Sequence, residues 1–370
     1  MKIVKLFLIG VFSIILAGNV SLAETIPFDS DKWEIKAKES KIVDYLGQKS
    51  LYMNQGLALI KDSEFTDGII EYDVAFSQKR GFFGAVWRLQ NSANYEKFYM
   101  RPHQSGNPDA NQYTPVFNHQ SGWQLYYGDG YGAAVKYAFD KWVHVKIVVS
   151  GQNAEVYIKN MDEPVLSARL LRNTKAGKIG LIHERFAPVH FANFSFTPKS
   201  NPPLKGKVKA PVKSSAGTVI TWSVSDAFKE EALSGKFRFS ESDWKNLTWE
   251  KYAAEPTGLL DLARANAIEK DKNTVFAKAT VIAENEHIKP MKFGFSDRIK
   301  VYLNGQLIYG GNNTYRTRDY RYLGTISFLD QLYLPLKKGE NELMMAVSES
   351  FGGWGVQARF DDMKEIAFGK

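Results

Sequence analysis

The sequence predicts an all-β protein made of two β-sandwich (jelly-roll) domains. Three segments, at 69–76, 82–89 and 142–149, alternate apolar and polar residues with the period of two that a half-buried strand requires. Other short segments of this kind recur between turns rich in Gly, Asn and Asp, and this spacing is typical of sandwiches. The 370 residues exceed the roughly 100 to 200 expected of one domain, so two domains are predicted.

The composition excludes several classes of protein. An apolar fraction of 44% and a charged fraction of 24% are those of an ordinary globular protein, which argues against disorder and against a bundle of membrane spans. The chain has no cysteine, so structural disulfides, thiolate metal sites and a cysteine nucleophile are excluded together. The formal net charge of +8 indicates that anionic partners are favoured.

Residues 1–23 have the pattern of a secretory signal peptide. Two lysines precede an apolar run at 6–20 that is too short for a comfortable membrane span, and small residues lead to a cleavage site after Ala23. Asn19 stands where a lipoprotein would carry its lipidated cysteine, which excludes a lipid anchor. We therefore expect an exported protein, periplasmic or extracellular after cleavage near Ala23. Its available partners would be molecules of the cell envelope, and nucleic acid is not expected among them. No membrane span is expected in the mature chain.

One linker divides the mature chain. The segment 199–216 is rich in Pro and Lys and has little apolar content, so it can form neither a helix nor an inner strand. This places one domain at 24–198 and the other at 217–370. In the second domain, Asn304-Gly305 lies between two apolar runs and predicts a hairpin with a type I′ turn.

The first domain resembles a known family of sandwiches. Trp142 leads into a strand, a turn follows at 150–153, and further strands are indicated at 154–159, 177–181 and 191–196. This order resembles the back half of a laminin G-like, or concanavalin A-like, jelly roll. The resemblance implies the fold and leaves function open, because that fold hosts lectins, glycosidases, lyases and adhesion modules.

The second domain resembles a different jelly roll. The segments 293–307, 334–343 and 344–347 are similar to the late strands of a galactose-binding-like domain, of the sort appended to glycoside hydrolases. In that resemblance the turn at 338–341 joins two strands. The likeness does not identify a sugar site.

The first candidate ligand surface is the segment 87–127, where long loops carry many amides and aromatic rings. Loops of this length are costly to order and are often functional. Flat rings stack on the apolar faces of sugars, while amides, His and Arg satisfy the hydroxyl groups. The alternative is that the rings fill the core and the amides bond the loop to itself. The candidate residues are Trp87, Arg88, Arg101, His103, Gln112 and Trp123.

The second candidate surface lies at 310–322, where arginines alternate with tyrosines. Arginine grips carboxylate, sulfate or phosphate with a planar fork, so an anionic glycan is among the candidates. Alternatively, these arginines pair with nearby aspartates and the tyrosines cover the core. Trp354 stands among glycines, either in a tight turn against a sheet or as an exposed stacking platform. The candidates are Arg316, Arg318, Tyr320 and Trp354.

Catalysis is weighed on two sets of residues. Glu71 and Asp73 share one face of a strand, as the acid pair of concanavalin A-like glucanases does, but Ala75 and Phe76 occupy the positions of the third carboxylate.

A polysaccharide lyase needs a base and a group that neutralises the uronate, and Arg101, His103 and Tyr113 offer those types. Some laminin G-like bacterial domains resemble 3-keto-disaccharide hydrolases, which keeps a glycoside hydrolase as an alternative. No convincing acid/base pair emerges, so the sequence favours a binder over an enzyme.

Cofactors are not predicted. The segment 128–132 offers one carboxylate, which is too few for Ca²⁺, and the six histidines have no zinc-binding spacing. The sequence thus predicts a secreted or periplasmic protein that binds a glycan or polysaccharide without catalysis. A glycan-active enzyme, either a polysaccharide lyase or a hydrolase, is the alternative. The sequence does not predict the oligomeric state.

Overall fold

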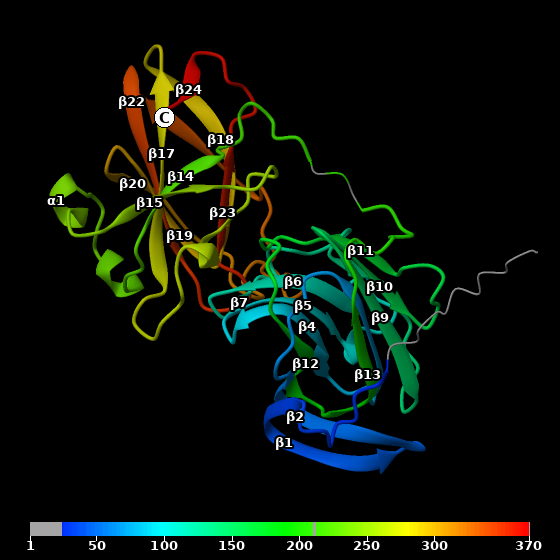
Figure 1. Ribbon diagram of the computed structural model, residues 1–370. Coiled ribbons are helices and arrows are strands. Elements are labelled where there is room, and N and C mark those ends of the chain that lie inside the picture. Colours follow the sequence, from blue (N-terminus) through cyan, green and yellow to red (C-terminus); the bar gives the residue numbers. More distant parts are fainter. Residues whose placement is uncertain (1–23, 209, 211, 370) are drawn as a thin grey trace, which may run out of the picture.

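The computed structural model describes residues 24–208, 210 and 212–369 of the chain (Figure 1). The predicted signal peptide therefore lies outside the described residues. Nearly all regular structure is β-strand, as the sequence predicts, and the described helices are single turns. These are η1 (Pro102–Gln104), η2 (Glu230–Leu233), α1 (Glu241–Trp244) and η3 (Leu262–Arg264). Within the described part of the chain, no helix has the length and apolar character needed to cross a membrane.

Strands β1–β13 form the first sandwich. Its hydrogen-bonded order is β11-β10-β9-β3-β13-β2-β12-β4-β5-β6-β7, with β1 on β2 and β8 on β6. The predicted strands at 69–76, 82–89 and 142–149 are confirmed as β3, β4 and β9. The strands are β1 (Trp33–Tyr45), β2 (Gln48–Ile60), β3 (Gly68–Ala75), β4 (Gly81–Asn91), β5 (Asn94–Met100), β6 (Asn111–Phe117), β7 (Gln120–Ser121), β8 (Gly132–Ala133), β9 (Trp142–Ser150), β10 (Asn153–Ile158), β11 (Leu166–Arg169), β12 (Lys178–Phe186) and β13 (Val189–Pro198).

Strand β2 joins the two layers of this sandwich. Its first half pairs with β13 and its second half with β12, while β1 follows it along its whole length. The change of partner falls beside Gln55, whose φ is +55°, and Gly56. A Cβ on Gly56 would lie 2.2 Å from the backbone oxygen of Lys36, so only glycine lets β1 approach this closely. The chain can therefore turn from one layer to the other without leaving the sheet.

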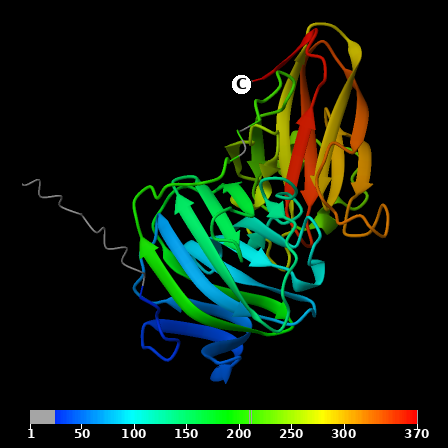
Figure 2. The same ribbon diagram turned by 90° about the vertical axis from the view of Figure 1, so that its right-hand side faces the viewer.

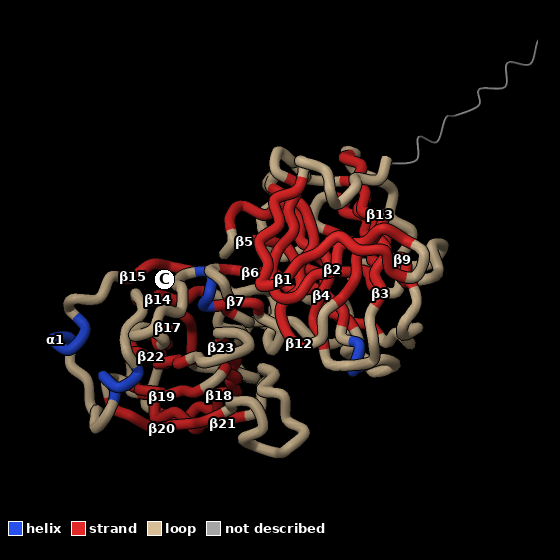
Figure 3. Tube along the Cα trace, turned by 90° about the horizontal axis from the view of Figure 1, so that it is seen from below, coloured by secondary structure: helices blue, strands red, loops and turns tan. Residues whose placement is uncertain are grey.

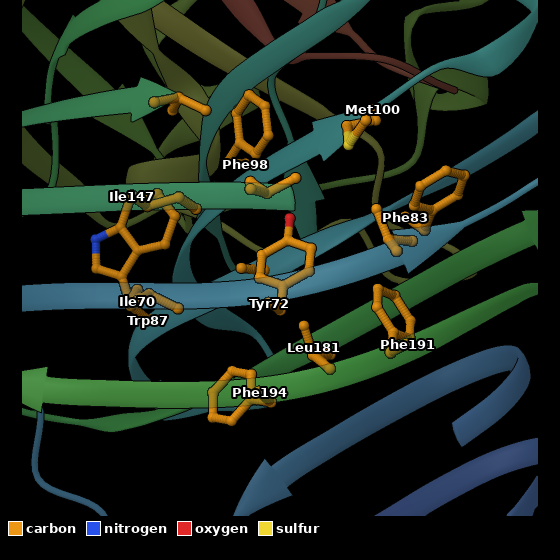
Figure 4. Close-up of a cluster of buried hydrophobic side chains, with 14 of the residues drawn as sticks. Ile70, Tyr72, Phe83, Trp87, Phe98, Met100, Ile147, Leu181, Phe191 and Phe194 are labelled. Carbon is orange, nitrogen blue, oxygen red and sulfur yellow. The ribbon is translucent and has the colours of Figure 1, made fainter. Parts of the chain in front are cut away.

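The core of the first sandwich lies between its two layers. Phe83, Ala85 and Trp87 alternate along β4 and are all buried, so one face of that strand points inward. Figure 4 shows the Trp87 ring with Tyr72, Phe98 and other apolar side chains in this core. The opposite face of β4, with β5, β6 and β12, faces outward, and we call it the outer face.

Strands β14–β24 form the second sandwich, from one sheet ordered β15-β14-β17-β22-β19-β20 with β24 on β17, and another ordered β16-β23-β18-β21. Asn304 and Gly305 have φ of +49° and +76°, which confirms the predicted hairpin between β19 and β20. The strands are β14 (Thr221–Ser225), β15 (Trp249–Ala253), β16 (Leu260–Asp261), β17 (Thr274–Ala283), β18 (His287–Ser296), β19 (Arg298–Leu303), β20 (Gln306–Asn312), β21 (Asp330–Leu336), β22 (Gly339–Ser348), β23 (Gly355–Arg359) and β24 (Ile366–Phe368).

The two sandwiches meet side by side, and the loops near β6 and β7 lie against the second sandwich (Figures 1 and 3). Between β13 and β14 the described residues form no strand. This connecting segment is nevertheless held to the first sandwich, because the backbone N–H groups of Lys205 and Gly206 both donate to the Glu155 carboxylate.

Candidate functional site: the surface at the junction of the two sandwiches

A loop of the first sandwich, residues 122–131, is inserted into the second. Gln124 at its start is fully buried. Its backbone N–H donates to the Gly352 oxygen at 2.9 Å, its backbone oxygen accepts from Ile326 N at 3.0 Å, and its Nε2 donates to the Leu323 oxygen at 2.7 Å. These bonds make the loop an additional element of the second sandwich, and they fix how the two sandwiches meet.

Glycines make room for this loop. A Cβ on Gly352, whose φ is +110°, would lie 2.1 Å from Gln124 Oε1. A Cβ on Gly324, whose φ is +80°, would lie 2.1 Å from Gln124 Nε2. Leu125 fits against Gly353 and Gly355 in the same way. The glycines around position 354 therefore leave the space that Gln124 and Leu125 of the first sandwich occupy.

Trp354 is not a ligand platform. Its side chain is fully buried in the core of the second sandwich, and its Nε1 donates to the Val347 oxygen at 3.0 Å. Of the two alternatives for this segment, the tight turn against the sheet is the one observed.

Trp87 and Arg88 are structural as well, so their prediction as ligand contacts is corrected. Trp87 is fully buried in the first core, as its alternation with Phe83 along β4 requires. Arg88 is 2% exposed, and its guanidinium lies 2.8 Å from Asp67 Oδ1 and donates to the Thr66 oxygen at 2.8 Å. Neither side chain presents a polar group or ring face to solvent.

Arg101 and Gln112 position the inserted loop. Arg101 is 7% exposed and donates to the Asp109 oxygen at 2.8 Å, and its guanidinium also contacts Tyr99 and the Gln112 carbonyl. Gln112 Nε2 in turn donates to the Trp123 backbone oxygen at 3.0 Å. The prediction of Arg101 as a ligand contact is therefore corrected: its guanidinium binds the Gln112 side chain, which in turn binds the backbone at Trp123.

The lyase set does not converge. Arg101 lies on the outer face with the network just described, whereas Tyr113 points into the core. The Tyr113 hydroxyl donates to Glu96 Oε2 at 2.7 Å, and it is 1% exposed. His103 contacts Phe82 edge-on, with 5.3 Å between the ring centroids. Burial, with Arg80 and Arg101 nearby, lowers the pKa of His103, which favours the neutral imidazole.

Glu71 and Asp73 do share a face, as predicted, but they bind a histidine between them. His144 Nδ1 lies 2.7 Å from Asp73 Oδ1, and its Nε2 lies 3.5 Å from Glu71 Oε1. The hydrogen bonds to Asp73 and then to Glu71 raise the pKa of His144 to about 9. Although burial raises the Asp73 pKa, hydrogen bonds from His144 and Asn193 hold it below its usual value. This arrangement on β3 and β9 is an ion-pair cluster, and it lies on the other layer of the sandwich from the strands β4 and β12 that reach the junction.

We expect His144→Gln to destabilise the protein at neutral pH and to have little effect at high pH. A histidine whose folded pKa is raised contributes stability that is complete below its unfolded pKa near 6.5 and lost as pH rises through 9. Because His144 is 39% exposed, solvent screening reduces the contribution to about 1 kcal/mol. Urea unfolding of both proteins at pH 6 and pH 10 measures it. An equal difference at the two pH values would show that the charge is not what stabilises the cluster.

The exposed rings and cations of the junction gather into one surface. It extends from β4 and β12 across the inserted loop to the turn after β22, and we call it the junction surface. Its members are Arg80, Phe82, Trp123, Arg185, Phe186 and Phe351. Its two most exposed rings are Phe186 at 48% and Phe351 at 44%, while Trp123 is half-buried.

Ring and cation contacts connect this surface across the two sandwiches. The Trp123 and Phe351 ring centroids are 5.8 Å apart. The Arg185 guanidinium lies 5.1 Å from the Phe351 centroid, and the Arg80 guanidinium lies 4.6 Å from the Phe186 centroid. Each arginine is thus held over an aromatic face, which limits the freedom that it would lose on binding a ligand.

The junction surface carries uncompensated positive charge. In the described part of the chain, no carboxylate forms a salt bridge with Arg80 or Arg185. The neighbouring Glu184 is bound by Lys97, which is 1% exposed and also donates to Ser121 Oγ at 2.9 Å. The surface therefore offers two free guanidinium forks beside flat apolar rings.

The arginine and tyrosine segment at 310–322 lies beside this surface and divides into two kinds of residue. Arg318 is structural, because its guanidinium binds Asp330 and the Asn313 side chain. Tyr320 is 75% exposed and Arg316 is exposed, with its guanidinium 5.0 Å from the Tyr315 ring centroid. Arg316 and Tyr320 are therefore exposed and remain predicted ligand contacts. The prediction of Arg318 as a ligand contact is corrected, because its guanidinium is already bound within the second sandwich.

Sequence reasoning missed most of the junction surface. Phe82, Phe186 and Phe351 come from three distant parts of the chain, so no local pattern brings them together. Arg185 and Phe186 are the last two residues of β12, which extends beyond the strand predicted at 177–181. Among the described residues, no group of three or more His, Asp or Glu side chains is placed to hold a metal ion.

No protein-family model and no curated protein matches this sequence. Solved structures do resemble part of it. The carbohydrate-binding module CBM66 from Bacillus subtilis is 16% identical and aligns with 45% of this chain and 94% of its own, at a TM-score of 0.35. A Bacillus subtilis protein of unknown function with a galectin-like fold is 12% identical over 48% and 95% of the two chains, at 0.36.

The GH43 BlXynB protein from Bacillus licheniformis is 13% identical, at a TM-score of 0.35. That alignment covers 47% of this chain and 39% of BlXynB, so the chain spans well under half the length of that protein. At these scores the likenesses do not indicate what this chain binds.

Proposed function

We propose that this protein is an exported glycan-binding protein without catalytic activity, and that it binds an anionic glycan on the junction surface. The observation that carries the proposal is the pair Arg80 and Arg185, which stack on exposed rings and have no carboxylate partner in the described residues. The signal-peptide pattern at 1–23 supports the proposal of export to the periplasm or to the outside of the cell. The first sandwich would be laminin G-like and the second galactose-binding-like.

The chemistry of such a surface suits an acidic sugar. A ring such as Trp123 can stack on the apolar face of a pyranose, and a planar guanidinium can bind a carboxylate or sulfate with two parallel hydrogen bonds. Both groups are present within one patch, since Arg185 and Trp123 both contact the Phe351 ring. A neutral sugar would leave the two arginines unpaired, so anionic glycans should bind more tightly.

The enzyme alternative lacks a suitable pair of groups at this site. Glu184, the carboxylate next to Arg185, is bound by Lys97. Glu71 and Asp73 lie on the other layer of the first sandwich, around His144. A glycosidase needs two carboxylates flanking one bond, and a lyase needs a base that can reach the uronate. The release of reducing ends or of unsaturated uronates by the wild type would contradict the non-catalytic proposal.

The test is calorimetric titration of the full chain with a uronate polysaccharide, a sulfated one and neutral dextran. We expect the anionic polymers to bind and dextran to bind weakly or not at all. Arg185→Gln and Trp123→Ala should each weaken binding by about 5- to 30-fold, or about 1 to 2 kcal/mol.

The matched controls are Arg238→Gln and Phe237→Ala, which change an exposed cation and an exposed ring elsewhere in the second sandwich. They should bind like the wild type. If the controls lose as much affinity as Arg185→Gln, binding is diffuse electrostatic attraction and the proposed surface is wrong.

A further inference from the structure

The arginine and tyrosine loop between β20 and β21 is fixed beside the junction surface by the same residue that joins the sandwiches. Gln124 Nε2 donates to the Leu323 oxygen, and Gln124 O accepts from Ile326 N. Trp123 of the junction surface directly precedes Gln124 in the chain. The Tyr127 hydroxyl adds a bond to the Ile326 oxygen at 2.6 Å. In Figure 2 this loop, drawn in orange, projects from the second sandwich at the level of the junction.

The tip of this loop is closed on itself. Arg316 N donates to the Tyr322 oxygen at 2.9 Å, and Tyr322 N donates to the Asp319 oxygen at 2.9 Å. The Tyr322 hydroxyl donates to the Thr325 oxygen at 3.1 Å. The backbone is thus ordered without covering the side chains of Tyr315 and Tyr320, which are 41% and 75% exposed. Such exposed rings on an ordered loop are available to a ligand at low entropic cost.

The charges of the loop match those of the junction surface. Arg318 and Arg321 are paired with Asp330 and Asp319. For Arg316, by contrast, no salt bridge occurs among the described residues, and its guanidinium stacks over Tyr315. The loop therefore repeats the arrangement of the first surface, namely a free guanidinium held over an aromatic ring.

We propose that the loop carrying Tyr315, Arg316 and Tyr320 is a second contact site for the same ligand, so that the protein recognises an extended anionic polysaccharide. This proposal rests on the proposed function. A chain that engages both sites gains affinity because the second contact becomes intramolecular, whereas a short oligosaccharide reaches only the junction surface. The Gln124 contacts hold the two sites in fixed relation, which preserves this gain.

The experiment compares oligogalacturonates of three and of about twelve sugar units by calorimetry, with wild type and with Arg316→Gln/Tyr320→Ala. We expect the longer chain to bind the wild type at least 10-fold more tightly, and most of that advantage to disappear in the variant. Trisaccharide affinity should change less than twofold. A longer oligosaccharide also contains more overlapping stretches that can bind a single site, which raises its apparent affinity. This effect is the same for the wild type and the variant, so it cancels in the comparison.

The outcomes separate this proposal from the function on which it rests. If neither oligosaccharide binds the wild type, the uronate form of the proposed function fails. If both bind but the variant keeps the full advantage of the longer chain, only the second site is refuted. Arg238→Gln/Phe237→Ala removes a cation and a ring elsewhere on the same sandwich, and it must keep the wild-type ratio. A fall in that control would also refute the second site.

Discussion

Gly352→Ala should destabilise the protein by about 3 kcal/mol, because the added methyl group has no space. Its Cβ would lie 2.1 Å from Gln124 Oε1 and 2.3 Å from Gln124 Cδ. Gln124 cannot move away cheaply, since its amide is fully buried and bound to the Leu323 oxygen. The positive φ of +110° adds strain for any residue with a side chain. Urea unfolding measures the loss.

Gly339→Ala is the matched control for this variant. Its φ of +92° imposes a similar backbone strain, but nothing lies within 4 Å of the added Cβ. It should therefore lose about 1 to 2 kcal/mol from strain alone. The difference between the two variants isolates the contact with Gln124, and Gln124→Ala should reduce that difference. Equal losses in both glycine variants would mean that the Gln124 side chain is not held tightly against Gly352.

The junction should weaken as pH rises from 5 to 8. The Tyr126 hydroxyl, fully buried, lies 2.8 Å from Glu255 Oε1 and 3.1 Å from Asp261 Oδ2. A phenol has one hydrogen to donate, so it can satisfy only one of two ionised carboxylates. All three groups can form hydrogen bonds when one of the two carboxyl groups is protonated and donates to the Tyr126 oxygen. The closed junction therefore favours binding of a proton.

The pKa values give the direction and the pH window. Burial raises the pKa of Glu255 to about 7 and that of Asp261 to about 6, above their usual values of 4.5 and 3.8. Arg264 lowers both values, and Arg169 and Arg172 each lower one of them, but burial prevails. Carboxyls with raised folded pKa values contribute stability that is present at acid pH and lost as pH rises through those values. The loss between pH 5 and pH 8 should be on the order of 2 to 3 kcal/mol.

Glu255→Gln/Asp261→Asn tests this prediction. The amides keep the shape of the two carboxyl groups and cannot ionise, so the variant should lack this component of the pH dependence. The free energy of unfolding of both proteins, measured at pH 5, 6.5 and 8, gives the comparison. Parallel pH profiles would show that the two carboxylates stay ionised in the closed junction, contrary to the hydrogen-bond argument.

The sequence predicted the elements because they depend on local pattern. The alternation at 69–76 and 142–149 marks β3 and β9, and Asn304-Gly305 marks a turn that needs positive φ. The inward face of β4 was also readable, since Trp87 alternates with Phe83. Trp87 is therefore a core residue by its position in that alternation, although its residue type alone favours a ligand contact.

The site could not be predicted in the same way, because its geometry comes from contacts distant in sequence. Gln124 is buried only because Gly324 and Gly352, about 200 residues away in the chain, leave space for its side chain. Gln112 is a positioning residue because its side-chain amide binds the backbone of the inserted loop, and Arg101 is one because it binds the Gln112 side chain. The sequence predicts candidate surfaces at 87–127 and 310–322 without a relation between them. They lie side by side at Gln124 because of how the two sandwiches pack.

A crystal structure of the full chain with an oligogalacturonate bound tests the central claim most directly. We predict a sugar ring against Trp123 or Phe351 and its carboxylate against Arg185. A ligand seated elsewhere would contradict the claim. One such place is the hollow of about 490 Å³ whose lining includes Pro164 and Lys207.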